Sequence, residues 1–309
     1  MAFALDDRKH IGRQLRKIAR RQLQRTIAAL EADDTGAFTR AVHESRTRVK
    51  KVRAVAAFLK AAGARVPPKD RSRLKSAART LSRVRDSAAI VEALDRLHHR
   101  YSKQLPQHTY GVLRRALVDA RDRAEARAHR DGCVRDVARQ LKKTRDAARK
   151  WSGSSIDWRA AIDLLTTSYR RSRKAMEHAR STGQSAAVHR WRKAVKGLWY
   201  QLRLARPLAT RMSALVNEMK RLETALGDDH NLVVLAATLR ACPGLRTMHA
   251  QIHQVDRLAI RMRKPLRRRA FALGRRLHHR TPKEFARWLR ASAKDPRSHA
   301  PRRAEALRH

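Results

Sequence analysis

The sequence has little of what a disulfide-stabilised, secreted or membrane protein requires. Among its 309 residues there are two cysteines, Cys133 and Cys242, which lie far apart without any metal-ligand spacing. They are therefore interpreted as two ordinary thiols. No apolar run approaches the length of a bilayer span, and the N-terminus lacks the apolar core of a signal peptide. We expect a cytoplasmic protein that makes no membrane contact.

Motifs for catalysis and metal binding are equally scarce. The sequence contains no glycine-rich phosphate loop, no Ser/His/Asp arrangement and no acidic pair suited to acid–base chemistry. His249 and His253 have the spacing of two helical metal ligands, but no third ligand is indicated and no Glu lies between them. We therefore expect no metal, no cofactor and no enzymatic activity.

Acidic residues are rare compared with basic ones. Lys and Arg number 74 against 27 Asp and Glu, which gives a formal net charge of +47. Base composition of the genome would explain why Arg outnumbers Lys, but it does not explain the excess over acids. So large a charge strains a compact state by self-repulsion, and a polyanionic partner relieves that strain. Hydrophobic residues at 42% are sufficient for real cores, so the chain is a folded basic protein.

No segment shows the alternating pattern of a β-strand, whereas nearly every window has helical periodicity. Breaks at 33–36, 63–70 and 105–106 indicate four helices in the first half, the last over 107–150 with Asp131-Gly132 as a candidate interruption. Trp151 to Ser155 is the best linker candidate, and the pattern then begins again. We predict an all-α protein of two antiparallel four-helix bundles related by a pseudo-twofold axis, with halves 1–150 and 151–292 and a basic, disordered tail at 293–309.

One unusual segment occurs twice, from Val42 and again from Val188. Each copy has a His, an Arg three residues later and a Lys four residues after the Arg. At about 100° per residue these side chains fall within an arc of roughly 60–80° on one helix face. The two cationic rows are His43, Arg46, Lys50 and Arg53 in the first copy, and His189, Arg192, Lys196 and Arg203 in the second.

The second copy is followed by Leu226-Gly227-Asp228-Asp229-His230-Asn231, and a run from Arg267 leads to Thr281-Pro282-Lys283-Glu284. This combination resembles the CHAD family, the conserved-histidine α-helical domain, over about residues 8–292. The resemblance implies two pseudo-symmetric four-helix bundles that bind inorganic polyphosphate along a central basic groove or pore, in some relatives at polyphosphate granules. The chain lacks the Glu-x-Glu-x-Lys strand of the catalytic domain fused to other relatives.

The first half departs from this pattern. It has Arg85-Asp86 where the second half has His230-Asn231. In the second half, Trp199 occupies the place that corresponds to Arg53, and Gly197 lies within the helix. The two halves are therefore expected to contribute unequally to a ligand.

Polyphosphate has no bases to be recognised, so its binder needs charge density and donor geometry. Arg offers a planar fork to two phosphate oxygens and Lys a rotatable point charge. Two alternatives remain open: the rows are solvated helix faces, and the two histidines are hydrogen-bonded to neighbouring helices. Besides the two rows, the candidate phosphate-binding residues are Lys17, Arg21, Lys75, Arg79, Arg170, Lys174, Lys220 and His230.

The sequence thus predicts a non-enzymatic polyphosphate-binding protein, with protein partners unknown. The alternative is sequence-independent, nucleoid-type binding of a DNA or RNA backbone by charge. Aromatic residues at 5% are too few for base-stacking platforms, which argues mildly against single-stranded nucleic acid.

Overall fold

The computed structural model describes residues 3–6, 8, 10–32, 38–151, 156–209 and 211–292, except for the side chains of 83–87. Its described part is all-helical and contains no strand, so the all-α part of the prediction is confirmed. The predicted linker at 152–155 and the tail at 293–309 lie outside the described residues. The longer helices are α1 (Ile11–Glu31), α2 (Phe38–Ala61), α3 (Pro68–Arg100), α4 (Gln107–Arg130), α5 (Cys133–Ala147), α6 (Trp158–Thr182), α7 (Ser185–Ala205), α8 (Met212–Ala241), α9 (His249–Leu277) and α10 (Pro282–Ala291).

Local sequence signals fix several helix ends. The Asp157 side chain accepts a hydrogen bond from the Ala160 N–H at the start of α6, and Gly183 ends that helix with φ 64°. Thr281 and Glu284 form the reciprocal capping box that begins α10, as the sequence predicts. These ends depend on contacts within a few residues, which is why they can be recognised in sequence.

The predicted fourth helix is two helices. Gly132 adopts φ 63°, a left-handed conformation in which α4 ends and α5 begins. The corresponding region of the second half is the single helix α9, which continues through Pro265. Asp131-Gly132 is therefore a true break, and the two halves differ in how they use their last long segment.

Three hydrophobic cores hold the structure, rather than one in each predicted bundle. The first joins α1, α2, the start of α3 and α5, together with the end of α7. The second joins α6, α7, the start of α8, the end of α9 and α10. The third combines the end of α3 and α4 with the end of α8 and the start of α9. The two halves of the chain therefore share a core.

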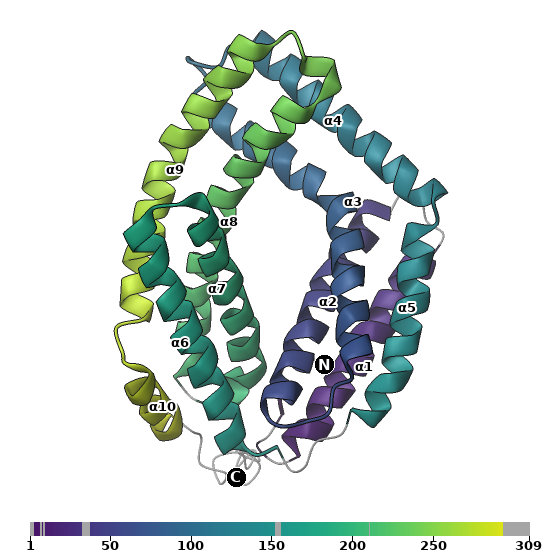
Figure 1. Ribbon diagram of the computed structural model, residues 1–309, viewed down its shortest axis with the longest axis vertical. Coiled ribbons are helices and arrows are strands. Elements are labelled where there is room, and N and C mark those ends of the chain that lie inside the picture. Colours follow the sequence, from purple (N-terminus) through teal and green to yellow (C-terminus); the bar gives the residue numbers. More distant parts are fainter. Residues whose placement is uncertain are drawn as a thin grey trace, which may run out of the picture.

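The long helices α3 and α8 each extend from one core into another and contact one another. In Figure 1, α1, α2 and α5 lie on one side and α6, α7 and α10 on the other, and α3, α4, α8 and α9 meet at the far end. Helix α2 also contacts α7, so the helices that carry the two cationic rows are neighbours.

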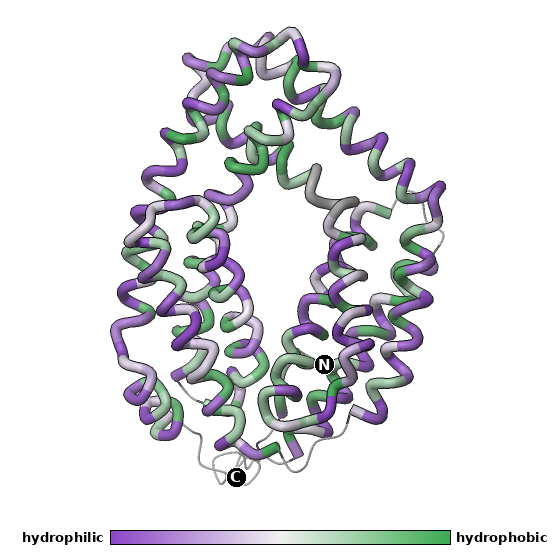
Figure 2. The backbone as a smooth tube through the Cα atoms, viewed as in Figure 1, coloured by the Kyte–Doolittle hydropathy of each residue, from purple (hydrophilic) through white to green (hydrophobic). Residues whose placement is uncertain are grey.

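In Figure 2, hydrophilic and hydrophobic residues are interspersed along the helices. This is the pattern of helices that pack one face on a core and expose the other to water. Within the described part of the chain, no helix combines the length and the apolar character that crossing a bilayer would require.

Trp151 lies inside the first core rather than in an exposed linker. Its side chain is fully buried, and its indole Nε1 donates a 2.9 Å hydrogen bond to the carboxylate of Asp70. Asp70 is also buried and accepts a second hydrogen bond from Arg73 at 3.0 Å. The sequence did not reveal this burial, because the partner of Trp151, Asp70 of α3, is distant in sequence.

Gly274 marks the closest approach between α9 and its neighbours. A Cβ at this position would lie 2.7 Å from the Met176 sulfur and 2.7 Å from the Trp191 ring, which is itself stacked on Phe271. At Gly227, by contrast, an added Cβ would meet no neighbouring atom within 4 Å.

We predict that Gly274→Ala lowers the free energy of unfolding by about 1–3 kcal/mol, because the added methyl overpacks a rigid aromatic contact. Gly227→Ala is the matched control, since the same change inside α8 meets no neighbour and adds about 0.5–1 kcal/mol through helix propensity. Urea unfolding of both variants measures the two values. A stabilising effect of equal size in both would contradict the close packing at α9.

Candidate anion-binding site

A pocket between α2 and α7 brings most of the two cationic rows together. It has a volume of about 410 Å³, and none of the described residues that line it is acidic. Arg46, Lys50 and Arg53 line it from α2, and Arg192, Lys193 and Lys196 line it from α7. We call it the α2–α7 pocket. The two rows therefore face one concave surface instead of pointing apart.

Each helix presents the row because its opposite face is buried. On α2, Val42, Val49, Val52 and Val55 are buried in the first core, and on α7, Val188, Trp191 and Val195 are buried in the second. Small residues, Ala54, Ala57 and Gly197, line the pocket between the cations. They leave space between the two helices where larger side chains would fill it.

Glu223 of α8 is a residue that the sequence analysis missed. It is buried, and its two carboxylate oxygens accept hydrogen bonds from Lys196 at 2.7 Å and from Lys220 at 2.8 Å. Burial alone would raise the pKa of Glu223, but these two ammonium groups outweigh it and lower the pKa to about 2. The signal in sequence was weak, since an acid three residues after Lys220 is an ordinary helix-surface pair.

Lys196 has the opposite balance. Burial lowers its pKa, and the attraction of Glu223 offsets this only in part, because Arg192 and Arg46 repel a further positive charge. The ion pair therefore stabilises the Glu223 carboxylate, but part of this stabilisation is offset by the cost of keeping the half-buried Lys196 charged. An acid of α8, the helix packed against α7, therefore compensates part of the charge of the α7 row.

Arg203 does not line the α2–α7 pocket. Its guanidinium lies 4.8 Å from the centre of the Trp199 ring and 5.7 Å from that of Phe3, and burial lowers its pKa. Lys220 lies 5.0 Å from the same Trp199 ring. Trp199, which occupies the position that corresponds to Arg53, therefore holds two cations against its ring without contributing a charge.

His189 and His230 form a pair on the other side of Arg192. Their ring centroids are 4.3 Å apart, and both line a cavity of about 200 Å³ with Ser185 and Asp229. Burial lowers the pKa of His230 to about 4, with a further contribution from Arg192, and burial also lowers the pKa of His189. Both rings are neutral at pH 7. His43, the counterpart in the first half, is exposed.

Asp229, which lines the same cavity, links α8 to α9. It is buried and accepts hydrogen bonds from Arg263 and Arg267 of α9, both at 2.9 Å. The arginines reach on to the Ser185 hydroxyl, and Arg267 also to the Gly183 carbonyl. This ion-pair network joins α8, α9 and the start of α7, which fixes the backbone from which the α7 row projects.

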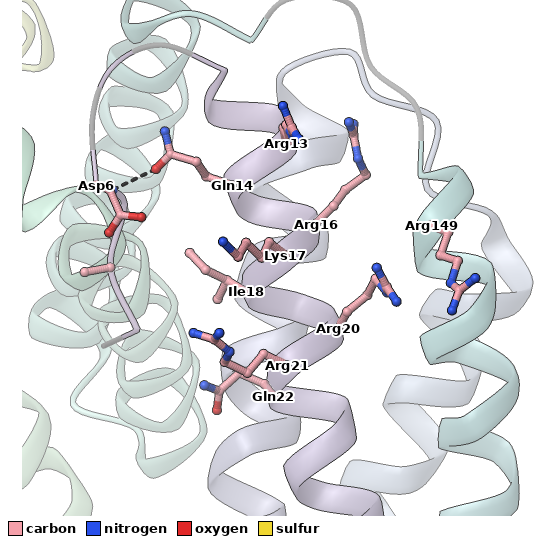
Figure 3. Close-up of a pocket in the computed structure, with 11 residues that line it drawn as sticks. Asp6, Arg13, Gln14, Arg16, Lys17, Ile18, Arg20, Arg21, Gln22 and Arg149 are labelled. Carbon is pink, nitrogen blue, oxygen red and sulfur yellow. Dashed lines mark hydrogen bonds between the residues drawn. The ribbon is translucent and has the colours of Figure 1, made fainter. Parts of the chain in front are cut away.

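The remaining candidates lie elsewhere. Lys17 and Arg21 line a different groove, on α1, which Figure 3 shows. Four exposed cations line none of the pockets found in the described residues: Lys75, Arg79, Arg170 and Lys174. These six candidates are not among the residues that line the α2–α7 pocket, because helix faces that share a charge pattern need not face the same space. Among the described residues, no group of three or more His, Cys, Asp or Glu could hold a metal ion.

The CHAD domain profile matches residues 6–240, which cover α1 to α8. The chain belongs to the CHAD family. A similar solved structure is the crystal structure of the CHAD domain from the plant Ricinus communis, with 18% sequence identity and a TM-score of 0.67 over 91% of this chain and 96% of that one. At this identity the likeness establishes the CHAD fold alone. No curated protein sequence matches the chain.

We predict that Glu223→Gln lowers the free energy of unfolding at pH 7 by about 1–3 kcal/mol, because it leaves the half-buried Lys196 ammonium without its carboxylate. The folded-state pKa of Glu223 lies below its ordinary value of 4.5. Its stabilisation is therefore complete above pH 4.5 and is lost as the pH falls toward about 2. The variant should lose this part of the acid sensitivity in urea unfolding across that range.

Glu177→Gln is the matched control, since Glu177 pairs with Arg173 on an exposed surface. It should leave stability within about 0.5 kcal/mol of the wild type. Equal effects of the two substitutions would show that Glu223 does not hold the α2–α7 pocket together.

We also predict that the His230 imidazole titrates near pH 4 in NMR spectra and that Arg192→Gln raises this midpoint, because it removes a nearby positive charge. Arg190→Gln is the control, since Arg190 contacts His178 on the exposed side of α7. A wild-type midpoint near the ordinary value of 6.5 would contradict the burial of this ring.

Proposed function

We propose that this CHAD domain binds inorganic polyphosphate in the α2–α7 pocket and catalyses no reaction. The observation that carries the proposal is the convergence of six Lys and Arg side chains from two copies of one motif on a cavity whose described lining contains no acid. A solvated helix face would not require that the two copies meet. A linear chain of phosphates supplies negative charge along its whole length, which matches two facing rows of donors.

The donor types suit this ligand. Arg46, Arg53 and Arg192 offer planar forks for pairs of phosphate oxygens, and the lysines offer rotatable point charges. The only aromatic residue that lines the pocket is Tyr200, which is buried and packs edge-on against Phe3. A base would therefore find no exposed ring on which to stack, which favours a ligand without bases.

We further propose that the two halves are related by a pseudo-twofold axis, with α1, α2 and α3 corresponding to α6, α7 and α8. Such an axis brings equivalent elements against one another. The contacts of α2 with α7 and of α3 with α8 have this property, and they support the relation. On this arrangement the α2–α7 pocket belongs to a central basic groove to which both halves contribute.

The second candidate function is sequence-independent binding of nucleic acid. It is favoured by the net charge of +47, which far exceeds what one pocket requires. A cytoplasmic location and an association with polyphosphate granules are part of the leading proposal.

We predict that replacing Lys50, Arg53, Arg192 and Lys193 with Gln weakens binding of long-chain polyphosphate at least a hundredfold, since each lost charge-assisted contact removes about 1 kcal/mol or more. This set leaves in place Arg46, which donates to Ser82 at 2.8 Å, and Lys196, which pairs with Glu223. Circular dichroism and a melting curve check that the variant is folded. Fluorescence anisotropy with labelled polyphosphate measures the affinity.

The matched control replaces Lys103, Arg115, Arg123 and Arg257 with Gln. These four cations are exposed and line none of the described pockets, and the control removes the same charge. Its affinity should fall by less than about tenfold, because only the long-range field is weakened. Equal losses in both variants would show that the α2–α7 pocket is not the binding site.

A competition experiment separates the two candidate functions. Unlabelled duplex DNA is added at the same phosphate concentration as polyphosphate, at constant salt, because both affinities fall with ionic strength. The proposal expects polyphosphate to remain bound. Displacement by DNA at equal phosphate would favour the nucleic-acid function.

A further inference from the structure

A cavity larger than the α2–α7 pocket lies on α1. It has a volume of about 670 Å³ and is bounded by α1, by Ala4 and Asp6 of the N-terminal segment, and by Arg149. A second cavity of about 380 Å³ continues it along α1 and shares Lys17, Arg20 and Arg21 with it. We call the two together the α1 groove.

The groove follows the face of α1 that points away from the core. Ile11, Leu15, Ala19, Leu23 and Ile27 are buried against the first core. The cations between them project on the other side of the helix at intervals of three or four residues. From Arg13 to Arg25 this face is about 18 Å long at a rise of about 1.5 Å per residue.

Charge in the α1 groove is strongly unbalanced. Its cationic lining consists of Arg13, Arg16, Lys17, Arg20, Arg21, Arg25, Arg145 and Arg149. Among the described residues two acids lie at it: Asp6 at the rim, and Asp146, whose carboxylate pairs with Arg145 at 3.0 Å. The positive charge therefore greatly exceeds what the neighbouring carboxylates can neutralise.

Some of these side chains are already held in position. Arg16 donates to the Trp151 carbonyl at 3.1 Å, and Arg145 donates to the Gln24 amide oxygen at 2.8 Å. The Nε of Arg20 is buried and has no hydrogen-bond partner among the described residues. Figure 3 shows the guanidinium groups of Arg20 and Arg149 directed toward the same space from neighbouring segments.

The α1 groove and the α2–α7 pocket have no lining residue in common. Helix α2 buries its valines in the core that it shares with α1 and turns its cationic row toward α7. The two positive surfaces are therefore separate sites, and a ligand at one leaves the other accessible.

We propose that the α1 groove is a second polyphosphate-binding site, so that one protein molecule holds two chains or two parts of one long chain. The identity of the ligand rests on the proposed function, whereas the existence of a separate anion site does not. None of the described residues that line the groove is aromatic, so a single-stranded nucleic acid would find no ring among them on which to stack its bases. Two sites on different faces raise avidity for a long chain and allow two chains to be cross-linked.

The test uses tripolyphosphate, a chain of three phosphates, and isothermal titration calorimetry at low salt to count bound ligands. The groove variant replaces Arg13, Lys17, Arg20 and Arg21 with Gln. The pocket variant replaces Lys50, Arg53, Arg192 and Lys193, and the control variant replaces Lys103, Arg115, Arg123 and Arg257. Circular dichroism and melting curves confirm that each is folded.

We expect two bound tripolyphosphates for the wild type and the control, and one for each of the other variants. A groove variant that binds as many ligands as the wild type overturns the second site and leaves the proposed function intact. A pocket variant that binds as many as the wild type overturns the proposed function instead. If the groove variant loses a single-stranded oligonucleotide but keeps both tripolyphosphates, the groove is a nucleic-acid site and the proposal is wrong.

Light scattering with long-chain polyphosphate gives an independent readout. Two sites per molecule cross-link chains, so the wild type and the control should form large particles near charge equivalence. Both single-site variants should lose this behaviour while still binding the chain. Particles of undiminished size with the groove variant would also contradict the second site.

Discussion

The packing of α2 against α7 imposes the main physical constraint on this molecule, because it brings two rows of like charge together. Unit charges about 4 Å apart interact by roughly 4 kcal/mol at an effective dielectric constant of 20, so such a contact is unfavourable on its own. Apolar cores on either side hold the two helices in place, and Glu223 neutralises part of the charge from behind. A polyanion that binds between the two rows relieves the repulsion that remains, and this relief favours its binding.

The same constraint shapes other parts of the molecule. Asp229 stands behind the α7 row as Glu223 does, and it collects Arg263 and Arg267 from α9. Trp199 accepts two cations on its ring, and Asp70 joins the buried Trp151 to α3. Few acids are present, and three of them, Asp70, Glu223 and Asp229, are buried where they fix helices in place. Most of the surface is thereby left positive, in agreement with the two separate basic cavities.

Much of the fold was predictable because its signals are local. Helical periodicity, the Gly132 break and the capping box at Thr281 depend on residues within one or two turns. The cationic rows were predictable for the same reason, since the spacing of His43, Arg46 and Lys50 fixes their common face. Arg203 shares the helix face of its row but does not line the α2–α7 pocket, because its guanidinium lies near the rings of Phe3 and Trp199, and Phe3 approaches it only in the folded chain.

Composition and spacing along single helices are enough to establish that this protein is helical and strongly basic, and that α2 and α7 carry equivalent rows. Three further features depended on the packing of distant segments: which rows share a cavity, the place of Glu223 behind Lys196, and the separate groove to which Lys17 and Arg21 belong. The physical reason is that a helix fixes the direction of its own side chains, whereas the surface that faces them is set by segments far apart in the chain.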